Sequence, residues 1–235
     1  MEFQMKKQIP NIITLLNLLC GVIAIIFVFY FKDNKFASLF IVLGAVFDFF
    51  DGMTARALKV SSPIGVELDS LSDVVSFGVA PSCIAFSLIG FDNHGFVAFI
   101  PLLMALFSSY RLAKFNLDTR QTTSFIGLPT PANAILWLSI PLIDLQSRFH
   151  ILYDVMSSVY FIVPVSLLMC YLLVSEIPMF SLKFHNLKWK DNSLRFVFLI
   201  LSAILLGVLW FAALPIIIIL YIILSVINNL KIKTR

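Results

Sequence analysis

Apolar segments of roughly membrane-spanning length recur along nearly the whole chain. A hydrocarbon core of ~30 Å needs about 20 apolar residues in a helix, and eight segments approach that length. They are residues 12–31, 36–57, 66–90, 95–116, 130–146, 153–177, 195–212 and 214–230. Because 60% of the 235 residues are hydrophobic and only 13% are charged, we predict one integral membrane domain over residues 1–235. Its fold class is an all-α, multi-pass transmembrane bundle.

The positions of Lys and Arg predict how this bundle is oriented. Cytoplasmic loops of membrane proteins carry the excess of basic residues. If both termini are cytoplasmic, only Lys32, Lys35 and Arg148 of the 17 basic residues fall on the outer side. The net charge of +4 is then explained by topology and by attraction to anionic membrane lipid. We expect no nucleic-acid partner.

One charged stretch, DFFDGMTARALKVSSPIGVELDSLSD at residues 48–73, interrupts the apolar sequence. It covers the cytoplasmic end of the second predicted span and the start of the third. On a helix, Asp48 and Asp51 are i, i+3 neighbours, and Asp69 and Asp73 are i, i+4 neighbours. Pro63 marks the turn between the two helices. Two antiparallel helices are therefore expected to direct four carboxylates into one small volume.

Four carboxylates at the edge of a low-dielectric layer repel one another and lose hydration, so we expect cations among them. Oxygen ligands without nearby Cys or His favour Mg²⁺, Mn²⁺ or Ca²⁺. Two such ions could clamp a phosphoryl or pyrophosphoryl group. Gly52 and Ala55 leave room for a bulky ligand, and Arg56 can pair with a phosphate. The alternative is that the charges only reach headgroup water and the small residues only allow close helix packing.

The pattern Asp48-x2-Asp51-Gly52-x2-Ala55-Arg56-x8-Gly65-x3-Asp69-x3-Asp73 is similar to the signature of the CDP-alcohol phosphatidyltransferases. That resemblance implies a membrane enzyme with a six-helix core, which uses an alcohol to displace CMP from a CDP-linked lipid. It implies two divalent cations, Mg²⁺ or Mn²⁺, on Asp48, Asp51, Asp69 and Asp73. It also implies that Asp73 is the general base. Further implied contacts with CDP-diacylglycerol are Gly52, Ala55, Arg56, Ser62 and Gly65.

Three other stretches narrow the resemblance to one branch of the family. IPNIITLLNLLCG (9–21), RLAKFN (111–116) and FIGLPTPAN (125–133) resemble segments of the membrane-embedded phosphatidylserine synthases of bacteria and archaea. This implies transfer of the phosphatidyl group from CDP-diacylglycerol to L-serine, giving phosphatidylserine and CMP. It also implies a bacterial inner membrane location, an active site on the cytoplasmic side, and a homodimer.

The acceptor needs its own residues, because zwitterionic serine requires a cation for its carboxylate and an acceptor for its ammonium group. Arg111, Lys114 and Asn116, at the cytoplasmic end of the fourth predicted span, are expected to bind it. These residues could instead be ordinary positive-inside anchors. Thr14 and Asn17 are polar positions in the first span. They could contact the cytidine or diphosphate of CDP-diacylglycerol, or they could bond a neighbouring helix.

Two alternatives remain at the level of sequence. Phosphatidylglycerophosphate synthase, or another CDP-alcohol phosphatidyltransferase, would share the aspartate signature, but a glycerol phosphate acceptor should demand a denser basic cluster. A cation transporter could also use intramembrane aspartates. Transporters more often place them near the bilayer midplane, on broken helices within internal repeats. The position of these aspartates at the cytoplasmic edge favours the enzyme.

Overall fold

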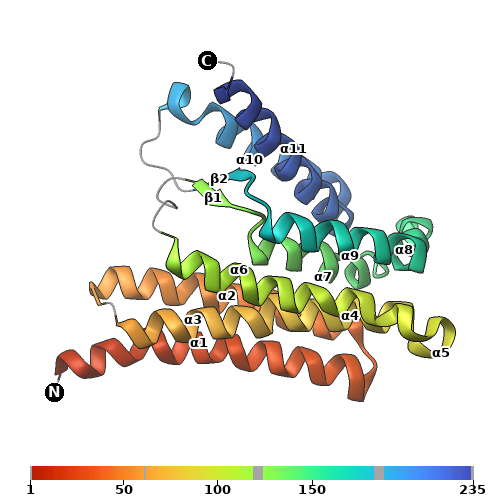
Figure 1. The fold of residues 1–235 in the computed structure, drawn as a ribbon, viewed down its shortest axis with the longest axis horizontal. Helices are drawn as coiled ribbons and strands as arrows, with labels where there is room; N and C mark the ends of the chain where they lie inside the picture. The colour runs from red at the N-terminus through yellow and green to blue at the C-terminus, as the bar shows by residue number, and fades with distance from the viewer. Residues whose placement is uncertain (1, 61, 119–123, 183–187, 234–235) are drawn as a thin grey trace.

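The computed structural model is almost entirely helical and describes residues 2–60, 62–118, 124–182 and 188–233. In the first half, α1 (Glu2–Ile26) continues through a π-helical turn to Phe31 and is followed by α2 (Asn34–Leu58). Next, α3 (Pro63–Asp73) continues through a π-helical turn (Val74–Val79) into α4 (Ala80–Ile89). The short α5 (Phe91–His94) and a 3-10 segment (Gly95–Leu102) lead into α6 (Leu103–Leu117). These helices run side by side as one bundle (Figure 1).

The second half adds further helices and two short strands that the sequence did not predict. The helices are α7 (Thr130–Ile143), α8 (His150–Ser157), α9 (Val159–Val174), α10 (Trp189–Leu209) and α11 (Ala213–Lys233). Strands β1 (Ser124–Ile126) and β2 (Pro178–Phe180) pair antiparallel. The rings of Phe198 in α10 and Tyr221 in α11 lie 5.9 Å apart. Helices α10 and α11 therefore fold back on each other, with the strands beside them (Figure 1).

Several helices are long and apolar enough to cross a membrane, as the sequence predicted. Within the described residues there are five such segments: Gln8–Phe31, Asn34–Leu58, Pro63–Ile89, Phe91–Leu117 and Asn192–Leu230. A sixth is obtained if Ser147–Ser157 and Val159–Val174, which meet at 67°, form one broken span. The chain is therefore a helical membrane protein with five or six segments of this kind.

Four predicted spans have a different form in the structure. The segment predicted at 153–177 is broken at Ser158, whose backbone is extended. The last two predicted spans, 195–212 and 214–230, lie in the single apolar segment Asn192–Leu230, which turns back at Trp210 (φ 53°). The segment predicted at 130–146 is α7, which has only 14 residues and a length of about 21 Å.

Helix α7 can be short because protein encloses it. Every residue from Leu136 to Ile143 is buried. Leu138 packs with Phe77 in a core cluster formed with the first half of the chain, whereas Trp137 packs with Met104 in the cluster shared with the C-terminal helices. A helix that is apolar on all sides fits such a central position.

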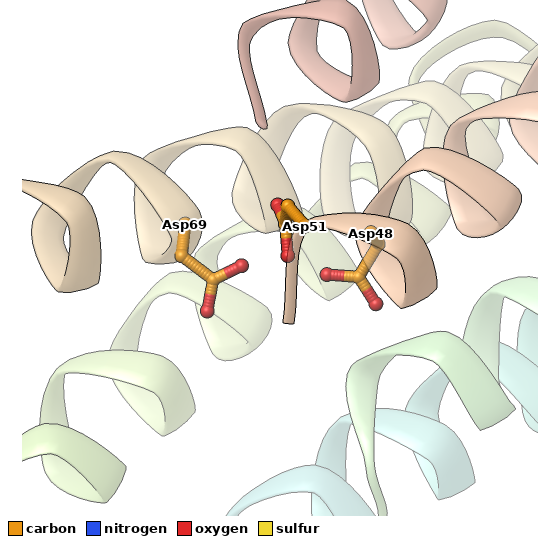
Figure 2. A group of neighbouring side chains, drawn as sticks. All are labelled: Asp48, Asp51 and Asp69. Atoms are coloured by element: carbon orange, nitrogen blue, oxygen red, sulfur yellow. The ribbon is translucent and has the colours of Figure 1, made fainter. Parts of the chain in front are cut away.

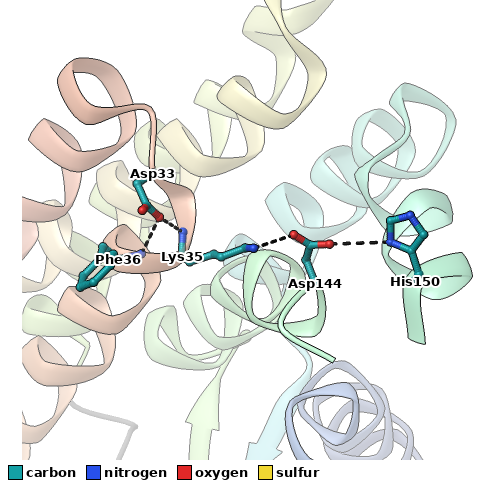
Figure 3. Close-up of polar contacts among 5 residues, drawn as sticks. All are labelled: Asp33, Lys35, Phe36, Asp144 and His150. Carbon is teal, nitrogen blue, oxygen red and sulfur yellow. Dashed lines mark hydrogen bonds and ion pairs between the residues drawn. The ribbon is translucent and has the colours of Figure 1, made fainter. Parts of the chain in front are cut away.

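A polar cluster ties three helices together at the end of α2 that lies away from the charged stretch. Asp33 caps α2, accepting hydrogen bonds of 3.0 Å from the backbone N–H groups of Lys35 and Phe36. The ammonium group of Lys35 lies 2.8 Å from Asp144 at the end of α7. His150 at the start of α8 lies 3.7 Å from the same carboxylate (Figure 3). Lys35, assigned to the outer side by sequence, therefore has an acidic partner there.

The opposite end of the bundle holds the beginning of α1 and the turn from α2 to α3 (Figure 1). Arg56, in the last turn of α2, lies at this end. Of the basic residues that the orientation argument put on the cytoplasmic side, Arg120, Lys183 and Arg235 lie outside the described residues.

Helix α1 approaches the α3–α4 segment very closely at Gly21. A Cβ atom added there would lie 2.8 Å from Ser76 Cα and 2.6 Å from Ser76 Oγ. The hydroxyls of Ser76 and Ser72 donate to the carbonyls of Asn17 (2.9 Å) and Thr14 (3.2 Å). Small residues at such a contact let the two backbones approach and bond. This contact sets the position of α1 relative to α3.

We predict that Gly21→Ala destabilises the protein by about 1–3 kcal/mol, because the new methyl group would overpack against backbone. The matched control is Gly207→Ala in α10, where an added Cβ meets nothing within 4 Å. The measurement is thermal unfolding of both variants in the same detergent. Equal melting temperatures for the two variants would contradict the proposed close contact.

Candidate active site

The turn between α2 and α3 is built by local capping. Lys59 adopts a left-handed conformation (φ 52°), and its N–H bonds back to the end of α2, as is common at helix C-termini. Ser62 then caps α3, its hydroxyl accepting a hydrogen bond of 3.1 Å from the N–H of Gly65. Pro63 occupies the first helical position, which suits its fixed φ. The turn therefore returns α3 along α2, with the aspartates of both helices on facing sides.

The four predicted carboxylates come together as the sequence indicated. Ligand oxygens of Asp48, Asp51 and Asp69 all lie within 4.8 Å of one another. In Figure 2 two of these side chains come from one helix and the third from another, and their carboxylates point toward one another. Asp73 is not one of these three, but it lines one cavity together with them. Asp73 Oδ1 also lies 3.4 Å from Asn17 Nδ2.

This arrangement is electrostatically costly without a counter-charge. Two carboxylates about 5 Å apart repel each other by roughly 3–4 kcal/mol at an effective dielectric constant near 20. Within the described part of the chain, none of the four forms a salt bridge with Lys or Arg. An oxygen-only donor set of this kind fits a hard divalent cation. The residues present can therefore hold a metal ion.

Helix α1 supports the cluster from one side. The hydroxyl of Thr14 lies 2.6 Å from Asp51 Oδ2, and Asn17 bonds Asp73 as described. Both polar residues of the first span thus bond carboxylates of neighbouring helices, one of the two possibilities raised by the sequence. Thr14 also borders a cavity next to the cluster, whereas Asn17 is completely buried.

One cavity, of about 160 Å³, opens beside Asp51 and Asp69. Four of the predicted CDP-diacylglycerol contacts border it, namely Gly52, Ala55, Ser62 and Gly65, together with Thr14. The sequence reading missed Pro10 and Asn11, which also line it. At Gly65 an added Cβ would lie 3.0 Å from Asn11 Oδ1, so a side chain there would crowd this wall.

A larger cavity, of about 350 Å³, is lined by all four aspartates. Arg56 borders this cavity. Gly52 lines both the smaller and the larger cavity. The far wall of the larger cavity includes Arg111 and Asn116 from α6, and Thr130 at the start of α7. Asn116 donates a hydrogen bond of 2.9 Å to Ser70 Oγ in α3. The acidic cluster therefore shares one space with Arg111 and Asn116, two of the three predicted acceptor residues.

Two polar groups in this wall are buried without a partner. The Arg111 side chain lies in the larger cavity wall although the residue is only 7% exposed, and its Nε has no hydrogen-bond partner among the described residues. Thr130 Oγ1 is in the same condition, at 1% exposure. Buried polar atoms are rarely left unpaired, so both residues are candidates for contact with a ligand in this cavity. Thr130 was missed by the sequence reading, although its place between two prolines in LPTPAN was a signal.

Lys114 has a different environment from Arg111. Its ammonium group pairs with Glu176 at 3.3 Å on an exposed part of the surface. It borders a small cavity together with Arg111, Ile126 and Ser175, and is not part of the described lining of the larger cavity.

Comparison with known proteins places this arrangement in a family. The CDP-alcohol phosphatidyltransferase profile matches residues 7–173. CDP-diacylglycerol–serine O-phosphatidyltransferase of Bacillus subtilis is 44% identical over 129 residues, which cover 53% of this chain and 70% of the relative. The enzymes of the same name from Helicobacter pylori (strain 26695) and Methanocaldococcus jannaschii are 36% and 37% identical. Those matches cover 61% and 57% of this chain.

The chain spans about 60% of the length of the latter two relatives. The match of the family profile covers well over half of this chain and includes every aspartate of the cluster, both cavities and α7. The chain belongs to the CDP-alcohol phosphatidyltransferase family.

Proposed function

We propose that this protein transfers the phosphatidyl group of CDP-diacylglycerol to the hydroxyl of L-serine, giving phosphatidylserine and CMP. The observation that carries the proposal is the buried Arg111, which lines the same cavity as the four aspartates and has an unpaired Nε. The relatives named as serine phosphatidyltransferases in bacteria and an archaeon support it. Family membership sets the cation-transporter alternative aside, because the family consists of transferases.

In this proposal Asp48, Asp51, Asp69 and Asp73 hold two divalent cations, Mg²⁺ or Mn²⁺, and Ca²⁺ is able to occupy the same oxygen ligands. When bound, such cations neutralise negative charge on a diphosphate and its leaving group. Thr14 and Asn17 orient Asp51 and Asp73 through the hydrogen bonds described above. The metal ligands are thus themselves held by a neighbouring helix, as productive metal sites require.

The smaller cavity is the proposed site of the CDP group. Gly52, Ala55 and Gly65 leave its walls free of bulky side chains, and Ser62 offers a hydroxyl at its edge. Arg56 borders the larger cavity close to Gly52, which lines both cavities, and there it can hold a phosphate oxygen. The acyl chains remain in the lipid, and the headgroup enters from the side.

Asp73 is the proposed general base. It borders the larger cavity and takes the proton of the serine hydroxyl. The serine oxygen then bonds to the phosphorus that carries the diacylglycerol oxygen, as the bond from that phosphorus to CMP breaks. Arg111 holds the serine carboxylate, Thr130 donates to the same group, and the amide oxygen of Asn116 accepts from the ammonium group. Lys114 lies outside this set of proposed serine contacts, beside Glu176, and adds positive charge near the acceptor site.

The charge of the larger cavity favours serine over glycerol 3-phosphate. In its described lining the basic residues are Arg56 and Arg111, and the first is assigned to the donor diphosphate. One remaining guanidinium matches a single carboxylate, whereas the dianionic phosphate of glycerol 3-phosphate calls for more positive charge.

The remaining proposals concern the whole protein. We propose one domain of eight membrane passages, with both termini and the active site on the cytoplasmic side of a bacterial inner membrane. The fold-back of α10 on α11 and the burial of α7 support eight passages rather than five or six. The placement of Lys and Arg supports the orientation. A homodimer is proposed on family analogy alone.

Asp48→Asn and Asp69→Asn are each expected to abolish CMP release, because each removes a ligand charge that the cations need. The matched control is Glu67→Gln. Glu67 is an exposed carboxylate on α3, the helix of Asp69, and is in the described lining of neither cavity. Turnover is followed as CMP formed from CDP-diacylglycerol and serine in detergent. EDTA should stop the wild-type reaction, and added Mg²⁺ or Mn²⁺ should restore it. Full turnover of metal-stripped protein in EDTA would refute the metal assignment.

Asp73→Asn is expected to lose transfer while CDP-diacylglycerol still binds, because the amide cannot accept the serine proton. Binding is measured by equilibrium dialysis with labelled lipid substrate, and turnover by CMP release. Retention of more than a small fraction of wild-type turnover would show that Asp73 is not the base.

Arg111→Ala is expected to raise the serine KM by about one to two decades, the loss of a charge-assisted hydrogen bond of roughly 1.5–3 kcal/mol. Arg111→Lys should recover only part of this loss, because an ammonium group cannot make the bidentate contact. Lys114→Ala is the comparison and should change the serine KM far less. Initial rates are measured against each substrate at saturation of the other.

A rise in the lipid KM alone would move Arg111 to the donor site. A wild-type enzyme that ignores serine and releases CMP with glycerol 3-phosphate would overturn the acceptor assignment.

A further inference from the structure

The C-terminal helices contact the acceptor side of the active site through the two short strands. Residues 174–235 lie beyond the part of the chain that the family profile matches, and they include β2, α10 and α11. The hydroxyl of Tyr221 in α11 donates a hydrogen bond of 3.0 Å to the carbonyl of Phe180, the last residue of β2. This bond is buried, and the ring of Tyr221 packs on that of Phe180 with centroids 4.8 Å apart.

Helices α10 and α11 hold β2 at both of its ends. Asn229, two turns beyond Tyr221 in α11, donates through Nδ2 to the carbonyl of Pro178 at 2.5 Å. Arg195 in α10 donates through Nε to the carbonyl of Ser181, which directly follows β2, at 2.6 Å. A strand of three residues is too short to hold its position alone, so these side chains determine where β2 lies.

Strand β2 in turn positions β1 and the segment that enters the active site. The pairing sets Phe180 opposite Ser124 and Pro178 opposite Ile126. Directly after β1, the N–H of Gly127 donates to the carbonyl of Ile177 (3.0 Å), and that of Leu128 donates to the carbonyl of Leu172 (2.9 Å). Two residues further on, Thr130 reaches the larger cavity.

Gly127 leaves this segment little freedom to shift. Its φ of 77° suits glycine, and an added Cβ would lie 2.6 Å from the carbonyl oxygen of Leu173. Ile126 also borders the small cavity that Arg111 lines. A displacement of β1 would therefore move both acceptor-side groups, Thr130 and the surroundings of Arg111, but would leave α2 and α3 in place.

We infer that Tyr221 is a positioning residue for the acceptor subsite, and that α10 and α11 act as a brace which holds Thr130 and Arg111 in place through β2 and β1. The inference rests on the proposed function for the identity of the acceptor as serine. It assigns to the C-terminal helix pair a role in acceptor affinity. In the described linings of the two cavities beside the aspartates, no residue comes from α10 or α11.

The test is Tyr221→Phe, which keeps the ring and removes only the hydroxyl. Loss of one buried hydrogen bond should raise the serine KM by about three- to tenfold, while kcat and the KM for CDP-diacylglycerol stay within about twofold. Asn229→Ala should act in the same direction. The matched control is Ser225→Ala, one turn further along α11, whose hydroxyl bonds only inside the helix, to the carbonyl of Tyr221. This control should change neither KM.

A second measurement does not depend on the acceptor. In hydrogen–deuterium exchange of the full-length protein, Tyr221→Phe should speed exchange at the amides of Gly127 and Leu128 by about three- to tenfold. Exchange across residues 48–73 should stay unchanged. Unchanged exchange at 127–128, an unchanged acceptor KM, or an equal rise in both KM values would overturn the inference.

The proposed function and the inferred brace can be refuted independently of each other. If the wild-type enzyme uses another alcohol, the proposed function fails, and the brace is then judged by the KM for that alcohol and by the exchange data.

Discussion

The mutual repulsion of four carboxylates in a small, partly buried volume is the constraint on which the rest of this structure depends. Each close pair costs several kcal/mol, and within the described residues no Lys or Arg side chain forms a salt bridge with the group. The fold must therefore hold these charges together by packing and hydrogen bonds. Glycine and serine contacts between α1 and the α3–α4 segment, together with Thr14 and Asn17, provide that support.

The two sides of the aspartate cluster are built differently. On the proposed donor side, the cavity wall comes from α1, α2, the α2–α3 turn and α3, all within the first 70 residues. On the acceptor side, the wall combines α6 with the start of α7, and the strands connect it to helices near the C-terminus. A local wall suits a substrate common to the whole family. A wall assembled from distant segments can change without disturbing the aspartate cluster.

Much of the fold and the core of the site followed from the sequence because the responsible interactions are local. Helical spacing alone put Asp48 beside Asp51 and Asp69 beside Asp73, and the capping residues Ser62 and Pro63 set the turn between them. The first four predicted spans each match an apolar helical segment of the structure that is long enough to cross a membrane. The prediction was less accurate for α7, because a helix enclosed by protein is released from the length that the bilayer imposes.

The sequence by itself determined the membrane class, the helical architecture and the chemistry of the aspartate cluster, since hydropathy and i, i+3 or i, i+4 spacing act within a few turns of chain. Only the tertiary structure decided that Arg111 and Thr130 share a cavity with those aspartates, that Lys114 turns away to Glu176, and that Tyr221 reaches β2. These contacts join residues tens of positions apart. Their geometry depends on how whole helices pack, which no local pattern encodes.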